Sequence, residues 1–135
     1  MRNFRIFEEV YMKIFTSYFA MTRYFSDDLI PVSISRFAPP GYKGLAMPEL
    51  APSRELLAKY KQDKDESAYT KEYNEQLARL DATGILHKLE FMTKGKDCVL
   101  LCYEKTSNFC HRHLVADWLN QNGCDVQEWT KTTEA

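Results

Sequence analysis

Short apolar runs and longer amphipathic stretches follow one another along the chain, and their alternation predicts an α/β fold. Residues 13–20 and 29–35 are rich in aromatic and β-branched side chains, which favour strands. Residues 98–103 form a nearly continuous apolar run, as expected of a strand that is buried on both faces. Residues 124–129 alternate between polar and apolar side chains and predict a final strand.

Amphipathic stretches between and after these runs predict helices, because their apolar residues recur at helical spacing. The predicted helices follow the N-cap residue Ser53, cover residues 67–80 and 82–93, and run from Phe109 to Asn122. A connection from one strand through a helix to another strand of the same sheet is parallel and right-handed. We therefore predict a small, mostly parallel sheet of about four strands, flanked by helices in a Rossmann-like, three-layer arrangement.

The length of 135 residues fits a single domain with its own core. Residues 12–129 carry the periodic patterns and form the predicted domain. We expect residues 1–11 to be an extension that is frayed or forms a loosely docked helix, and residues 130–135 to be a polar tail. Met12 would be an ordinary first residue, so the sequence leaves open whether Met1 or Met12 is the start.

The composition argues against several classes of protein. The formal net charge is −1, so charge alone does not favour general nucleic-acid binding. No apolar run is long enough to span a membrane, and the N-terminus does not have the pattern of a secretory signal. We therefore expect a cytoplasmic protein without a membrane partner, in which the four cysteines are free thiols.

A group of reactive and charged side chains follows the apolar run at residues 98–103. In open α/β sheets, ligands bind beyond the carboxyl ends of the strands. The residues at this switch from strand to helix are Cys102, Glu104, Cys110, His111 and Arg112. Packing alone does not explain so many polar groups at one place, and the pattern predicts a functional site.

Each of these residues has a functional and a structural interpretation. Cys110 lies in the first turn of the predicted helix, where the helix dipole and the neighbouring His111 favour a nucleophilic thiolate. The alternative is a buried cysteine that packs as a small apolar residue. Arg112 is suited to binding an anion, and the alternative is a salt bridge to Glu104 or another acid. Glu104 is a candidate general base, and Cys102 is either a partner thiol or a structural residue.

Residues 36–50 contain turn signals and no periodicity, and loops of this length are often functional. Arg36, Tyr42 and Lys43 are therefore candidate binding residues, since this loop leaves a strand at the same edge of the sheet. The alternative is that the two cations are solvated and the tyrosine is packed. Tyr73 belongs to a helical stripe that is usually buried, although a phenol at the rim of a pocket can also donate a hydrogen bond to a ligand.

The two halves of the strand-to-helix switch together resemble the signature of the DUF488 family. They are Leu100-Leu-Cys-Tyr-Glu-Lys and Phe109-Cys-His-Arg-His-Leu-Val-Ala. DUF488 is a widespread bacterial and phage family of small proteins without an established activity. The resemblance extends from about Met12 to Trp129, in the short, phage-type form. It implies an α/β fold and a site that includes Cys102, Glu104 and the Cys-His-Arg sequence, and it implies no particular reaction.

The first functional hypothesis is an enzyme that uses a thiolate or a carboxylate at an anion-binding loop, on a phosphate- or nucleotide-like substrate. The second is a zinc centre, because Cys102, Cys110, His111 and His113 are suitable ligands. Against it, no Cys-x2-Cys pair is present, and adjacent residues on a helix point about 100° apart.

The third hypothesis is a non-catalytic module that binds a nucleotide or a nucleic-acid phosphate. A basic edge would then be formed by Arg36, Lys43, Lys105 and Arg112, with Tyr42 as a stacking surface. The sequence leaves open whether the protein is an enzyme. We expect a small anionic or nucleotide-like ligand and no cofactor.

Overall fold

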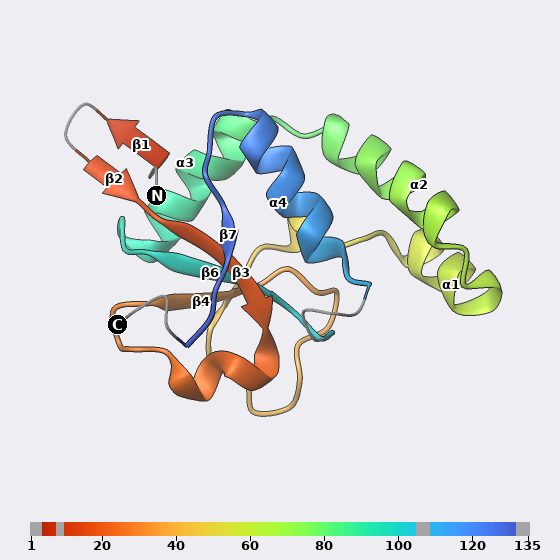
Figure 1. The fold of residues 1–135 in the computed structure, drawn as a ribbon, viewed down its shortest axis with the longest axis horizontal. Helices are drawn as coiled ribbons and strands as arrows, with labels where there is room; N and C mark the ends of the chain where they lie inside the picture. Colours follow the sequence, from red (N-terminus) through yellow and green to blue (C-terminus); the bar gives the residue numbers. More distant parts are fainter. Residues whose placement is uncertain (1–3, 8–9, 105–108, 132–135) are drawn as a thin grey trace.

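A five-stranded parallel sheet forms the centre of the molecule (Figure 1). The structure is a computed structural model that describes residues 4–7, 10–104 and 109–131. The strand order is β5 (Leu45–Ala46), β4 (Ile30–Ser33), β6 (Cys98–Cys102), β3 (Ile14–Tyr18) and β7 (Gln127–Glu128). Strand β6 pairs in parallel with both β3 and β4, and all of its residues are buried. The predicted α/β class and the parallel sheet are confirmed.

The α-helices lie close to the ranges that the sequence predicts. They are α1 (Arg54–Asp63), α2 (Glu66–Ala78), α3 (Ala82–Thr93) and α4 (His111–Gln121). The Ser53 hydroxyl accepts a hydrogen bond from the backbone N–H of Leu56 at 3.1 Å, which caps α1 as expected. In the part of the chain that the structure describes, no helix is long and apolar enough to cross a membrane.

Three local predictions are wrong. Residues 36–50 are not one irregular loop, because they contain β5 and a short 3₁₀ helix, η2 (Pro48–Leu50). Strands β1 (Phe4–Phe7) and β2 (Val10–Met12) pair in antiparallel fashion where a frayed segment or a helix was expected. The last strand, β7, covers only two residues of the predicted six-residue range 124–129. Strands this short have too few positions for alternation to be recognised in the sequence.

The two faces of the sheet are covered differently. Along β6, Cys98 and Leu100 belong to the larger core, which packs against the α-helices. Val99 and Leu101 belong to a smaller core on the opposite face. That face is covered by η1 (Phe19–Tyr24), a 3₁₀ helix that follows β3 directly, and by Trp129 after β7. The two faces of β6 are therefore both closed, and only its carboxyl end is left to meet a ligand.

Candidate functional site

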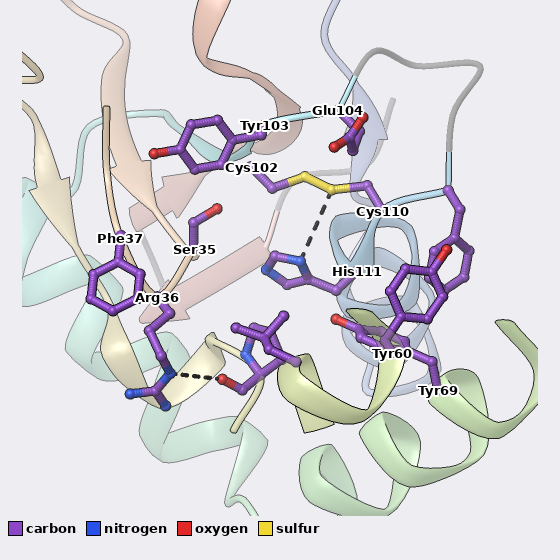
Figure 2. A pocket seen from close by; sticks show the side chains of 13 residues that line it. Ser35, Arg36, Phe37, Tyr60, Tyr69, Cys102, Tyr103, Glu104, Cys110 and His111 are labelled. Atoms are coloured by element: carbon purple, nitrogen blue, oxygen red, sulfur yellow. Dashed lines mark hydrogen bonds between the residues drawn. A yellow bond between two sulfur atoms is a disulfide. The ribbon is translucent and has the colours of Figure 1, made fainter. Parts of the chain in front are cut away.

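A pocket of about 390 Å³ lies at the carboxyl edge of the sheet. It is lined by the end of β6, by the segment that follows β4, and by the start of α4 (Figure 2). Parallel strands place their carboxyl ends at one edge, so these segments meet although they are far apart in the sequence. The sequence-predicted residues that line the pocket are Arg36, Cys102, Glu104, Cys110 and His111.

Cys102 and Cys110 are joined by a disulfide in the structure. Cys102 is the last residue of β6, and Cys110 is the N-cap of α4. The expectation that no cysteine forms a disulfide is therefore wrong for this pair, and it holds for Cys98 and Cys124, which are buried and not disulfide-bonded. Burial raises the pKa of the Cys98 thiol to about 12, so that this cysteine is protonated at neutral pH.

His111 is held in one orientation by the backbone. Its Nε2 atom lies 2.6 Å from the carbonyl oxygen of Ile34, and because a carbonyl only accepts, Nε2 carries the proton. The Nδ1 atom then has its lone pair available and lies 4.0 Å from the sulfur of Cys110. Burial lowers the pKa of His111 to about 4, with Arg112 and His113 adding to the effect, so the imidazole is neutral at pH 7.

Arg112 does not line the pocket. Its side chain is completely buried, and its Nε and Nη2 atoms donate to the two carboxylate oxygens of Glu128, at 3.1 and 2.9 Å. Glu128 also accepts from the hydroxyl of Thr16 at 2.7 Å. The acid that pairs with Arg112 is therefore Glu128 of β7 rather than Glu104. A fully paired, buried guanidinium has no surface on which to bind a substrate anion.

The third nitrogen of the Arg112 guanidinium, Nη1, contacts the end of β6 and the segment that follows it. Nη1 lies 3.1 Å from the sulfur of Cys102 and 2.5 Å from the carbonyl oxygen of Glu104. Glu104 thus contributes its backbone to Arg112, while its side chain is exposed at the pocket. The guanidinium also lies over the ring of Tyr18, 5.7 Å from its centroid. This arrangement places a fixed positive charge beside Cys102.

Arg36 is the arginine that faces the pocket. Its Nε donates to the carbonyl oxygen of Pro52 at 3.0 Å, which fixes the side chain at the rim. Among the described residues, this is the one hydrogen bond that Arg36 makes, so its terminal nitrogens are available to a ligand. Figure 2 shows Arg36 and Phe37 on one side of the pocket and Tyr60 and Tyr69 on the other.

Five phenylalanine and tyrosine rings line the pocket: Phe37, Tyr60, Tyr69, Tyr103 and Phe109. The rings of Tyr60, Tyr69 and Phe109 pack against one another with centroids 5.1–5.6 Å apart. Phe37 and Tyr103 are 67% and 50% exposed, so both rings present surface that a ligand in the pocket can contact. Sequence analysis missed most of this wall because Tyr60 and Phe109 fit the helical stripes of an ordinary core.

The other candidate binding residues lie elsewhere. Tyr42 donates its hydroxyl to the carbonyl oxygen of Leu45 at 2.6 Å, and with Lys43 it lines a different pocket, beside the starts of β4 and β6. Tyr73 is completely buried and donates to the carbonyl oxygen of Leu50 at 2.5 Å. The structure does not bring Tyr42 and Lys43 to the Cys–His site. Tyr73 does not line the pocket either, but its ring packs edge-on against His111, with centroids 5.5 Å apart.

The basic edge that was considered for nucleic-acid binding does not form among the residues described. Arg112 is buried, whereas Arg36 and Lys43 line different pockets. Lys105, the fourth member of that edge, lies outside the described residues.

A search of the described residues for metal-ligating groups finds Cys102, Cys110 and His111, whose ligand atoms all lie within 4.8 Å of one another. We expected Cys110 and His111 to point apart as neighbours on a helix. They converge because Cys110 is the N-cap and has an extended backbone, with φ −156° and ψ 143°, so that helical geometry begins only at His111. The same two features, soft sulfur ligands and a neutral imidazole fixed by a carbonyl, are typical of zinc sites.

The model of the DUF488-N3a family, described as the active DUF488-N3 subclade, matches residues 20–123. The chain belongs to the DUF488-N3a family. No curated protein and no solved structure matches the chain.

The DUF488-N3a match includes every residue of the pocket, from Ser35 to His111. It ends before Glu128, the partner of Arg112. The family resemblance that the sequence shows is thus confirmed.

Proposed function

We propose that this DUF488-N3a protein is an enzyme in which the Cys110 thiolate attacks a small, nucleotide-like substrate bound in the pocket. The observation that carries the proposal is the position of Nδ1 of His111, 4.0 Å from the sulfur of Cys110, at the wall of the 390 Å³ pocket. A nucleophilic thiol beside a correctly oriented base is the usual arrangement for covalent catalysis by cysteine.

The proposed chemistry begins with the reduced cysteine pair. The proton of the Cys110 thiol passes to Nδ1 of His111, and the thiolate forms a bond to an electrophilic atom of the substrate. His111 then returns the proton to the leaving group. In the second half of the reaction, water gives a proton to Nδ1 of His111 and attacks the atom bonded to sulfur, and the released Cys110 thiolate takes the proton back. Burial keeps the imidazole neutral while the cysteines are bonded, and a thiolate at this distance would favour the imidazolium that the first step produces.

The wall of the pocket supports a substrate with a planar body and one anionic group. Phe37 and Tyr103 present exposed rings on which a base can stack. Arg36 is the single cation among the described residues that line this pocket, so it can take one phosphate. A polyanion would lack partners there, and a bare phosphate would leave the aromatic wall unused.

Turnover by the reduced protein tests this proposal. The protein would be incubated with nucleoside mono-, di- and triphosphates, and the products read by chromatography and mass spectrometry. We expect one class of nucleotide to be consumed, with loss of turnover in Cys110→Ser and retention in the matched Cys98→Ser variant. Turnover that survives in Cys110→Ser would overturn the role of Cys110. Tight nucleotide binding without any turnover would favour a non-catalytic binding module.

A zinc centre is the second candidate, favoured by the three converging ligand atoms of Cys102, Cys110 and His111. Zinc would make both thiolates ligands and leave a fourth position open toward the pocket, as in catalytic zinc sites. The positive charge of Arg112, 3.1 Å from the sulfur of Cys102, weighs against a cation there. Native mass spectrometry of reduced protein with added zinc separates the two candidates, because only the second requires one bound ion that is lost in Cys102→Ser.

A further inference from the structure

Cys102 and Cys110 are a pair that the fold keeps together. They lie eight residues apart in the sequence, at the end of the central strand and at the N-cap of α4, and their sulfur atoms are bonded. The other two cysteines, Cys98 and Cys124, are not disulfide-bonded. The fold therefore selects one pair from four cysteines and places it at the wall of a pocket.

Arg112 singles out Cys102 as the thiol that would react first with an oxidant. The guanidinium donates to the Cys102 sulfur at 3.1 Å and is held in place by both oxygens of Glu128. Oxidation by peroxides proceeds through the thiolate, and a neighbouring arginine favours that form. Cys98 lies four residues earlier on the same strand, and no arginine among the described residues donates to its sulfur, so it is a natural internal control.

Small molecules can reach the pair through the pocket. Cys102 and Cys110 are only 1% and 7% exposed, but both line the 390 Å³ space at the edge of the sheet. A hydroperoxide is small enough to enter, whereas a large protein oxidant could not contact sulfur atoms buried to this degree. Cys110 lies within bonding distance of Cys102, as a resolving cysteine must.

We propose that Cys102 and Cys110 are a site of reversible oxidation by hydroperoxides, with Cys102 attacked first and Cys110 as the resolving thiol. The Cys102 thiolate attacks the peroxide O–O bond and becomes a sulfenic acid, and the peroxide leaves as an alcohol or water after taking up a proton. The Cys110 thiol then forms the S–S bond with Cys102, and the sulfenic oxygen leaves as water. The two sulfurs together lose two electrons, which the peroxide gains. A dithiol reverses the change and is itself oxidised to a disulfide.

The oxidation would control the site. The disulfide removes the Cys110 thiol, so the bonded protein could not carry out the attack proposed above, and reduction would restore it. This consequence rests on the proposed function, while the oxidation itself does not. The two can fail separately.

The test uses the full chain after reduction with dithiothreitol and removal of the reductant. Hydrogen peroxide is added in small excess, remaining thiols are alkylated, and tryptic peptides are analysed by mass spectrometry. Cleavage after Lys96, Lys105 and Arg112 puts Cys98 and Cys102 on one peptide and Cys110 on another. We expect these two peptides to be lost as free species and to appear linked, in Cys98→Ser as well as in the unmodified chain, and dithiothreitol to restore them.

Trapping of the intermediate tests the order of events. In Cys110→Ser the sulfenic acid on Cys102 has no partner, so dimedone should label Cys102. In Cys102→Ser, Cys110 lacks the arginine contact, so we expect dimedone to label Cys110 more slowly than it labels Cys102 in Cys110→Ser. Links that involve Cys98 or Cys124, links only between separate chains, or no link at all would overturn the proposal. Dimedone on Cys110 rather than Cys102 would overturn the order.

The proposed enzymatic activity and the proposed oxidation are contradicted by different experimental results. If the linked peptide forms but no nucleotide is consumed after reduction, the oxidation stands and the function is wrong. If a nucleotide is consumed but peroxide leaves both peptides free, the function stands and the oxidation is wrong.

Discussion

The two arginines that the sequence offered as anion-binding residues have opposite surroundings. Arg112 is completely buried and donates to Glu128, to the sulfur of Cys102 and to a backbone carbonyl. Arg36 lies at the rim of the pocket, and within the described part of the chain it makes one hydrogen bond, to the carbonyl oxygen of Pro52. The arginine of the Cys-His-Arg motif therefore contacts Cys102 from the interior, whereas the arginine of the loop after β4 lies at the pocket.

The difference shows that a motif residue can act on a site without touching the ligand. A buried guanidinium needs a carboxylate to balance its charge, and Glu128 provides it. Two of the three Arg112 nitrogens are engaged by this pairing and do not face a ligand. Its remaining nitrogen is fixed against Cys102, so the charge acts on a sulfur instead of on a substrate. The comparison predicts different consequences for changes at the two arginines.

The largest effect is expected for Arg112→Met. Removing one partner of a buried ion pair leaves Glu128 without its counter-ion, and such changes cost about 3–5 kcal/mol of unfolding free energy. Arg36→Met is the matched control, because at an exposed position we expect a change of about 0.5 kcal/mol or less. Urea unfolding of the two variants measures both values. Equal losses would contradict the assignment of Arg112 to the interior.

The second effect concerns His111, which lines the same pocket as Arg36 and directly precedes Arg112. The prediction applies to the protein with the Cys102–Cys110 disulfide. Burial lowers its pKa from the ordinary 6.5 to about 4. Between these two pH values the unfolded chain binds more protons than the folded protein. The free energy of unfolding therefore has its full value above pH 6.5, falls as the pH decreases and levels off below pH 4. The loss attributable to His111 should be about 3 kcal/mol.

Comparison of unfolding curves at pH 7 and pH 4.5 isolates this effect. In His111→Gln the amide can still donate to the carbonyl oxygen of Ile34, and the pH-dependent loss should be smaller than in the unmodified protein. His87→Gln, at an exposed position of α3, is the matched control and should leave the loss unchanged. An identical pH dependence in His111→Gln would show that other groups cause it.

A third prediction concerns binding through Arg36. Replacement by glutamine removes a charged hydrogen-bond donor at the pocket rim, and such bonds contribute about 1.5–3 kcal/mol. We expect binding of a nucleoside monophosphate to weaken by about 10- to 100-fold, with little change in stability. Calorimetry on reduced protein measures the affinity. The matched control is Lys43→Gln, because Lys43 lines a different pocket and should have no effect.

The smallest effect is expected for Tyr73→Phe. The change leaves the buried carbonyl oxygen of Leu50 without its donor, which costs about 1–2 kcal/mol. Tyr73 does not line the pocket, so the reactivity of Cys110 should be unchanged even though the Tyr73 ring packs edge-on against His111, with centroids 5.5 Å apart. A large change in Cys110 alkylation with unchanged stability would place Tyr73 in the site after all.

Local features of the fold were predictable because neighbouring residues determine them. Helix α3 has the expected bounds, since Asp81 precedes it and Lys94-Gly95 follows it with positive φ angles. The strand β6 and the start of α4 follow from one continuous apolar run and the polar break after it. Five of the nine candidate site residues line one pocket for the same reason, since parallel strands end at one edge.

The rest depends on contacts between distant parts of the chain. The pairing of Arg112 with Glu128 joins α4 to a two-residue strand whose position in the sheet the sequence pattern does not specify. The side chains of Cys110 and His111 converge because helical geometry begins at His111 and not at Cys110. The sequence pattern does not locate the start of a helix to within one residue. The helical stripe that contains Tyr73 also contains Tyr69, whose phenol was a candidate for the rim of a pocket, and Tyr69 does line the pocket. Phe37 has an exposed ring and no place in a predicted stripe.

The most direct test of the central claim is the pH dependence of iodoacetamide labelling of Cys110 in reduced protein, read by peptide mass spectrometry. The account predicts a midpoint well below the free-thiol value of about 8.5, together with protection by AMP that is lost in Arg36→Gln. Cys98 should stay unlabelled in the same sample, because it is completely buried. Labelling of Cys110 only at a midpoint of about 8.5 or above, or only after unfolding, would contradict an activated thiolate at this pocket.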